Sequence, residues 1–135
     1  MPTVLVIDDS KLIRMASQRS LVGAGYSVTE AGDGEEGLRV ARDLRPDLIV
    51  LDMMLPKLDG AQVLRRLRQD PSTAEIPVVV LTSLSQKNEE KLRKDGAQAF
   101  IEKEHVIEDP QPLLHAVERL LSELPFLGSK LRGSS

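Results

Sequence analysis

The sequence predicts an α/β fold, a doubly wound parallel sheet of five strands with five helices. Residues 48–52 and 77–82 are nearly continuous apolar runs, which are typical of strands buried on both faces. Such runs alternate with segments of helical periodicity, so right-handed crossovers should place helices on both faces of one sheet. A chain of 135 residues is long enough for one domain of this kind.

The elements follow one another without a visible internal repeat. The expected strands are residues 4–7, 26–31, 48–52, 77–82 and 99–103. The expected helices are about residues 10–22, 35–43, 60–70, 85–95 and 112–123. The domain should therefore span residues 1–124, and residues 125–135, which lack a regular period, should form a flexible tail.

Turn and cap residues support these boundaries. Ser10 can cap the first helix, and Gly23 and Gly25 can end it. Pro46 ends the second connection and Pro71 the third helix. The second strand alternates in polarity, which predicts a position at an edge of the sheet. The core-facing stripe of the first helix should be Leu12, Ile13, Ala16 and Leu21.

Composition excludes several classes of function. The net charge of −3 and the lack of a basic stripe argue against direct nucleic-acid binding. Tyr26, Phe100 and Phe126 are too few aromatic side chains for a base-stacking surface. The absence of cysteine excludes disulfides and thiolate metal sites. No leader and no apolar run of membrane-spanning length is visible, so we expect a cytoplasmic protein without membrane attachment.

Polar side chains lie at, or directly after, the ends of four of the five expected strands: Asp8 and Asp9, Asp52, Thr82 and Lys103. An isolated acid there would usually be a turn or cap residue, as Asp9 could be. However, the carboxyl ends of parallel strands meet at one edge of the sheet, so these groups should converge. Three carboxylates repel one another unless a cation such as Mg²⁺ offsets their charge.

The remaining two groups extend this chemistry. Lys103 would add a positive charge, and Thr82 would add a hydroxyl donor, beside one of the carboxylates. Such a set suits phosphoryl transfer to a carboxylate, with the acid as the nucleophile.

Several independent motifs accompany these groups. They are Asp8-Asp9, residues 31–34 (Ala-Gly-Asp-Gly), residues 51–56 (Leu-Asp-Met-Met-Leu-Pro) with Asp59-Gly60, Leu81-Thr82-Ser83, and Phe100 three residues before Lys103. Together they resemble the receiver domain of two-component response regulators, including the chemotaxis regulators, and the resemblance covers residues 3–124. It implies a flavodoxin-like fold with strand order 2-1-3-4-5.

The resemblance also implies a role for each site residue. Asp52 would be the phosphoacceptor and Thr82 and Lys103 would bind the phosphoryl group. Asp9 would bind Mg²⁺ directly and Asp8 mainly through water. The backbone carbonyl of Met54 would be a further protein ligand beside Asp52. Phe100 would be the aromatic residue whose inward rotation accompanies activation.

Activation would then change the face made by the fourth helix, the fifth strand and the last helix. The expected donor is a histidine kinase or phosphotransfer protein, and the reader of the changed face would be an unidentified protein. The chain would be a signalling domain rather than an enzyme, although it would catalyse its own phosphorylation and dephosphorylation. It would be a monomer or an activation-dependent dimer. One departure is Glu104, which follows Lys103 where the family usually has proline. This change, with Pro110 and Pro112, predicts a reshaped loop before the last helix.

Two alternatives remain. Gly32, Gly34 and Gly37 match the dinucleotide pattern G-x-G-x-x-G, and Asp52 lies twenty residues after Gly32. However, the acids around Gly34 would repel a pyrophosphate, and this reading leaves Lys103 unexplained. The second alternative is a receiver-like interaction module that never takes phosphate, and the Glu104 departure is what favours it.

Overall fold

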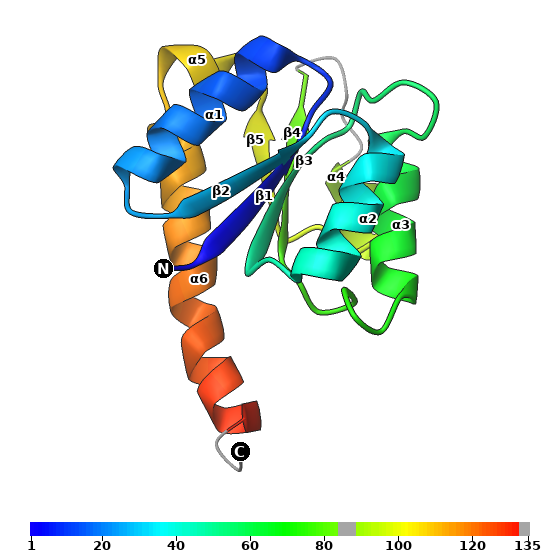
Figure 1. Ribbon diagram of the computed structural model, residues 1–135, viewed down its shortest axis with the longest axis vertical. Helices are drawn as coiled ribbons and strands as arrows, with labels where there is room; N and C mark the ends of the chain where they lie inside the picture. Colours follow the sequence, from blue (N-terminus) through cyan, green and yellow to red (C-terminus); the bar gives the residue numbers. More distant parts are fainter. Residues whose placement is uncertain (84–88, 133–135) are drawn as a thin grey trace.

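The structure is a computed structural model that describes the backbone of residues 1–83 and 89–132. Its centre is a sheet of five parallel strands in the order β2-β1-β3-β4-β5, which confirms the predicted topology and the edge position of β2 (Figure 1). The strands are β1 (Thr3–Ile7), β2 (Ser27–Ala31), β3 (Leu48–Asp52), β4 (Val78–Thr82) and β5 (Ala99–Glu102).

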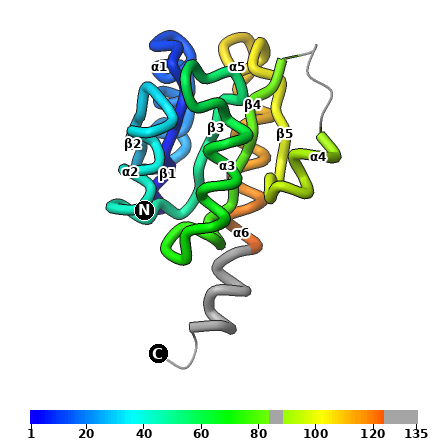
Figure 2. Tube along the Cα trace, turned by 90° about the vertical axis from the view of Figure 1, so that its right-hand side faces the viewer, coloured from blue at the N-terminus to red at the C-terminus, as the bar shows by residue number. Residues whose placement is uncertain are grey.

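Helices cover both faces of the sheet (Figure 1). One face carries α1 (Lys11–Gly23), α5 (His105–Glu108) and α6 (Gln111–Arg132), and the other carries α2 (Gly34–Leu44), α3 (Gly60–Gln69) and α4 (Glu89–Lys94). Figure 2 shows α4 beside the β5 edge of the sheet. Alternate side chains of the strands supply two cores, because successive residues of a strand point to opposite faces.

Side-chain caps begin the two helices that follow the carboxyl ends of β1 and β3. The Ser10 hydroxyl accepts a hydrogen bond from the Ile13 amide at 3.3 Å. Asp59 begins α3 with a capping box, in which its carboxylate accepts from the Gln62 amide and the Gln62 side chain accepts from the Asp59 amide. These caps hold the loops after β1 and β3 in place.

The helices differ from the prediction in number and length. The described residues contain a sixth helix, the short α5, in the loop that was expected to be reshaped. Asp109 precedes Pro110 and is extended, because proline disfavours helical backbone in the residue before it. This break separates α5 from α6. None of the described peptide bonds is cis.

The predicted end of the last helix, near Glu123, was wrong, because α6 continues to Arg132. Leu12 was also placed wrongly, because it is 62% exposed while Ile13 and Ser17 face the core. Of the predicted fourth helix, residues 85–88 lie outside the described residues.

Candidate functional site

The three predicted acids converge at the carboxyl edge of the sheet. Asp52 is the last residue of β3 and Asp8 directly follows β1, and both side chains are fully buried. Asp9 is exposed. One carboxylate oxygen from each of the three residues lies within 4.8 Å of the others. The sheet therefore forms a compact acidic cluster from residues far apart in the sequence.

Both oxygens of the Asp52 carboxylate are held in place. Oδ1 accepts a hydrogen bond from the Met54 amide at 3.0 Å, and Oδ2 accepts one from Lys103 Nζ at 2.7 Å. Lys103 Nζ also lies 3.4 Å from Asp8 Oδ1. The lysine thus bridges two buried acids, which fixes the orientation of Asp52 and offsets part of their negative charge.

Burial dominates the electrostatics of the cluster. Desolvation raises the pKa of Asp8 to about 6 against the lowering effect of the Ser10 amide, and the charge of Asp52 adds to the rise. Burial alone would lower the pKa of Lys103, but its hydrogen bond to Asp52 and the charges of both acids raise it. The site therefore combines a lysine held in its charged form, Lys103, with a carboxyl group, Asp8, that keeps its proton to a higher pH than usual.

The cluster fits a hard divalent cation. Among the described residues, Asp8 Oδ2 is a buried carboxylate oxygen without a hydrogen-bond partner. Such an oxygen is costly to bury unless a cation or water meets it. Together with Asp9 and Asp52 it offers the oxygen ligands that Mg²⁺ prefers. The side chain of Met54 is 60% exposed, and its amide anchors Asp52.

Thr82 and Phe100 point to the face of the sheet opposite to that of their neighbours Leu81 and Ile101. Thr82 ends β4 and is 6% exposed, and its carbonyl accepts a hydrogen bond from the Lys103 amide at 2.8 Å. Phe100, on β5, is half-buried against the core that α2, α3 and α4 cover. The structure thus places Thr82 at the carboxyl edge of the sheet. Phe100, which pairs with Val80, lies further from that edge.

Sequence reasoning missed Arg14, on α1. Its Nη1 donates to the Asp8 carbonyl at 2.7 Å, and its Nε lies 3.2 Å from Glu30 Oε1. Arg14 therefore orients the peptide that joins Asp8 to Asp9. One sequence contains no signal for this contact, because it depends on how α1 and β2 pack beside the loop.

The dinucleotide alternative does not fit the structure. The Asp33 carboxylate accepts from the Glu36 amide at 2.8 Å, so a side chain of the chain itself occupies the helix N-terminus. The glycines serve packing instead. A Cβ at Gly34 would lie 2.8 Å from the Leu58 carbonyl, and one at Gly37 would lie 2.6 Å from Ile7.

Comparisons with known proteins identify the family of the chain. Residues 4–118 match the model of the response regulator receiver domain. The DNA-binding dual master transcriptional regulator RpaA of Synechocystis is 41% identical over 93% of this chain and 52% of its own length. The Response regulator MprA of Mycobacterium is 38% identical over 88% of this chain and 51% of its own length. The chain thus spans about half the length of these two relatives.

Solved structures share the fold. The chemotaxis protein CheY4 of Vibrio cholerae is 30% identical with a TM-score of 0.79, over 89% of this chain and 98% of that one. The Francisella response regulator 1452 receiver domain is 32% identical with a TM-score of 0.78, over 91% of this chain and 98% of that one. The chain therefore belongs to the response regulator receiver domain family of two-component signal transduction.

Proposed function

We propose that Asp52 accepts a phosphoryl group from the phosphohistidine of a histidine kinase or phosphotransfer protein. The observation that carries this proposal is the 2.7 Å contact of Lys103 Nζ with the buried Asp52 carboxylate, beside two further acids. An Asp52 oxygen would attack phosphorus, and the bond from phosphorus to the imidazole nitrogen would break. The imidazole would leave with the electron pair of that bond.

The chain's own residues would prepare and stabilise this step. Lys103 and the hydroxyl of Thr82 would meet the oxygens of the transferred group, and the Met54 amide would orient the nucleophile. Asp8, Asp9, Asp52 and the Met54 carbonyl would hold Mg²⁺. When bound, this ion supplies positive charge that offsets the repulsion between the carboxylates and the phosphoryl group. Dephosphorylation by water would use the same residues.

The phosphoryl group on Asp52 would carry a charge of about −1.5 to −2 and three acceptor oxygens. We propose that Thr82 moves to meet it and that Phe100 rotates inward, which changes the face made by α4, β5 and α6. In this structure α6 takes the place of the expected fifth helix. An unidentified protein would read that face, with or without dimerisation of the chain.

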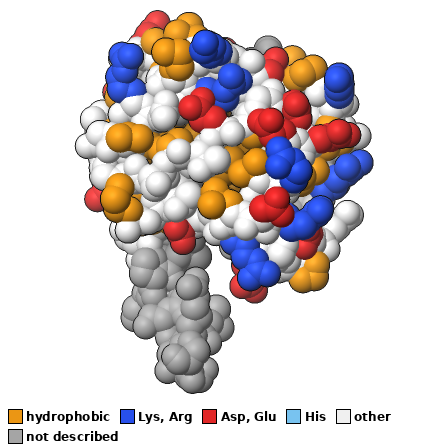
Figure 3. Space-filling view, viewed as in Figure 1, with side chains coloured by type: hydrophobic (Ala, Val, Ile, Leu, Met, Phe, Trp, Pro, Cys, Tyr) orange, Lys and Arg blue, Asp and Glu red, His pale blue; other side chains and the backbone are white. Residues whose placement is uncertain are grey.

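The limits of this unit are also part of the proposal. We place the receiver in residues 1–124, with residues 125–135 as a tail, in the cytoplasm. None of the helices in the described ranges, 1–83 and 89–132, is long and apolar enough to cross a membrane. Acidic and basic side chains are interspersed over α2 and α3 (Figure 3), which supports the expectation of no direct nucleic-acid contact.

Intact mass spectrometry after incubation with Mg²⁺ and acetyl phosphate tests the proposal. We expect the chain to gain one phosphoryl group in a Mg²⁺-dependent way, and the variant Asp52→Asn to gain none. If the chain binds Mg²⁺ but takes no phosphoryl group, the function is wrong and the phosphorylation-independent module replaces it. Glu104→Pro would then be the first variant to examine.

A further inference from the structure

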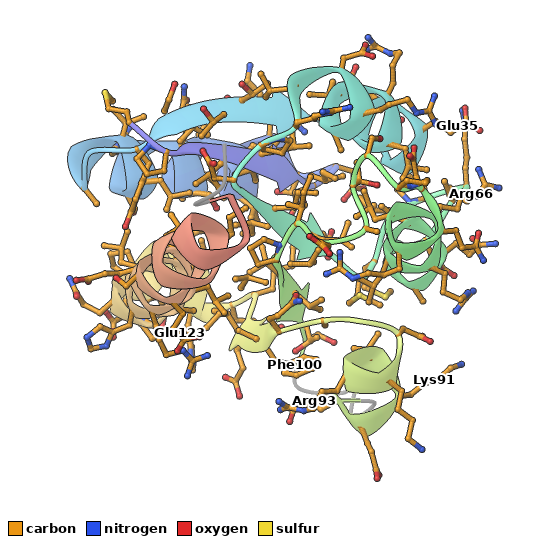
Figure 4. All side chains as sticks on the ribbon, turned by 90° about the horizontal axis from the view of Figure 1, so that it is seen from below. Glu35, Arg66, Lys91, Arg93, Phe100 and Glu123 are labelled. Atoms are coloured by element: carbon orange, nitrogen blue, oxygen red, sulfur yellow. The ribbon has the colours of Figure 1, made fainter. Side chains whose placement is uncertain are left out.

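Arg93, on α4, covers the aromatic residue of the proposed switch. The carbon at the centre of its guanidinium lies 4.9 Å from the centroid of the Phe100 ring, within the range of a cation–π interaction. Figure 4 shows Arg93 on the side of α4 that faces Phe100, and Lys91 on the opposite side of the same helix. The contact thus ties α4 to β5.

The register of the sheet relates this ring to the phosphorylation site. Phe100 is paired with Val80, and Thr82 lies two residues after Val80 on β4. Since side chains alternate along a strand, Thr82 points to the same face of the sheet as Val80 and Phe100. A displacement of Thr82 toward Asp52 would therefore open space on the face where the ring lies.

The ring also borders open space on its outer side. A groove of about 790 Å³ between α4 and α6 is lined by Arg93, Phe100, His115 and Arg119, among others. Phe100 is half-buried, and Arg93 itself is exposed. Lys103 Nζ contacts the Asp52 carboxylate at 2.7 Å in the same arrangement. An inward rotation of Phe100 would separate its ring from the Arg93 guanidinium.

We propose that Arg93 is a positioning residue that holds Phe100 in its half-exposed orientation, and so opposes the inward rotation that accompanies phosphorylation. The proposal rests on the function proposed above. Coupling between two sites is reciprocal, so a contact that is lost on activation also weakens the binding of a phosphoryl group. A cation–π contact at an exposed site corresponds to a factor of about two to five in this equilibrium.

The experiment measures binding of beryllium fluoride, which mimics an aspartyl phosphate, to the full chain in the presence of Mg²⁺. The variants are Arg93→Met, Arg93→Lys and, as the matched control on the same helix, Lys91→Met. Methionine resembles both side chains in helix propensity. Calorimetry gives the dissociation constant. Fluorine-labelled phenylalanine reports the ring directly, since the chain has only two phenylalanines.

We expect Arg93→Met to lower the dissociation constant by about two- to fivefold. Arg93→Lys should have a smaller effect, because an ammonium group keeps part of the attraction, and Lys91→Met should have none. In a Phe100→Leu background, Arg93→Met should change nothing. The proposal is wrong if Arg93→Met leaves the dissociation constant unchanged, or if it lowers this constant equally in the Phe100→Leu background. In either case, binding of beryllium fluoride by the parent chain would still support the proposed function. If the parent chain does not bind beryllium fluoride, the function fails, and this proposal with it.

Discussion

The buried carboxyl group of Asp8 makes the candidate metal site sensitive to pH. Because burial raises the pKa of Asp8 to about 6, a bound cation must displace its proton below that pH. We expect the Mg²⁺ affinity to fall by up to about tenfold for each pH unit below about 6. Calorimetric titrations between about pH 5 and pH 8 check this. An affinity that stays constant across this range would contradict it.

The same group has the opposite effect on the metal-free chain. The unfolded chain releases the Asp8 proton near its ordinary pKa of 3.8, whereas the folded chain keeps it up to about pH 6. The folded state therefore binds more protons between these values, so Asp8 destabilises the fold as pH rises through this window. The variant Asp8→Asn is the control, because it should lose this contribution to the pH dependence of unfolding.

The sequence predicts some of the individual residues of the site and misses others. Asp8, Asp52 and Lys103 could be found because each directly follows or ends a buried run, and the topology of a parallel sheet brings such positions together. Arg14 and Arg93 could not, because each acts from the side of a helix on a residue of another element. A helical arginine with such a contact has the same sequence pattern as one in solvent.

The start of α3 packs so closely on the end of β3 that it controls the position of Asp52. A Cβ at Gly60 would lie 2.5 Å from the Asp52 carbonyl oxygen and 2.6 Å from Met53 Cα. Both are backbone atoms, so the variant Gly60→Ala must displace the strand end. We expect a loss of about 1–3 kcal/mol in the free energy of unfolding and slower phosphorylation by acetyl phosphate.

The matched control for this prediction is Gly23→Ala, at the end of α1. A Cβ at Gly23 would meet nothing within 4 Å, so this variant should phosphorylate at the parent rate. Urea denaturation and the rate of mass gain measure the two effects. Equal rates for the two variants would show that contact between α3 and the strand end does not position Asp52.

Element boundaries could be predicted where a local signal sets them. Ser10 and Asp59 cap helices through their own side chains, and this chemistry is visible in the sequence. The break between α5 and α6 depends on Pro110. The formation of α5 itself depends on Val106, which packs into the core beside α1 and α6. Whether a single helical turn forms depends on tertiary burial of this kind, which no local sequence pattern indicates.

The whole topology follows from the hydrophobic pattern, because buried runs separated by amphipathic helices leave few other arrangements. What the pattern does not contain is how the ends of the strands opposite the site are held together. Arg68, on α3, donates to the carbonyls of Ile76 and Gly96, each at 2.7 Å, and to Gln98 Oε1 at 3.1 Å. One guanidinium thus joins α3 to the chain just before β4 and β5.

We therefore expect Arg68 to stabilise the whole molecule without acting on the site. The variant Arg68→Met leaves several carbonyls without their donor, and it should lower the free energy of unfolding by about 2–4 kcal/mol. Because Arg68 lies at the amino ends of β4 and β5, the Mg²⁺ affinity at the opposite edge should stay within about twofold of the parent value. Urea denaturation and calorimetry measure the two quantities.

Arg66, exposed on the same helix (Figure 4), supplies the control, and Arg66→Met should change the free energy of unfolding by less than about 0.5 kcal/mol. A similar small change for Arg68→Met would mean that water replaces the guanidinium at these carbonyls.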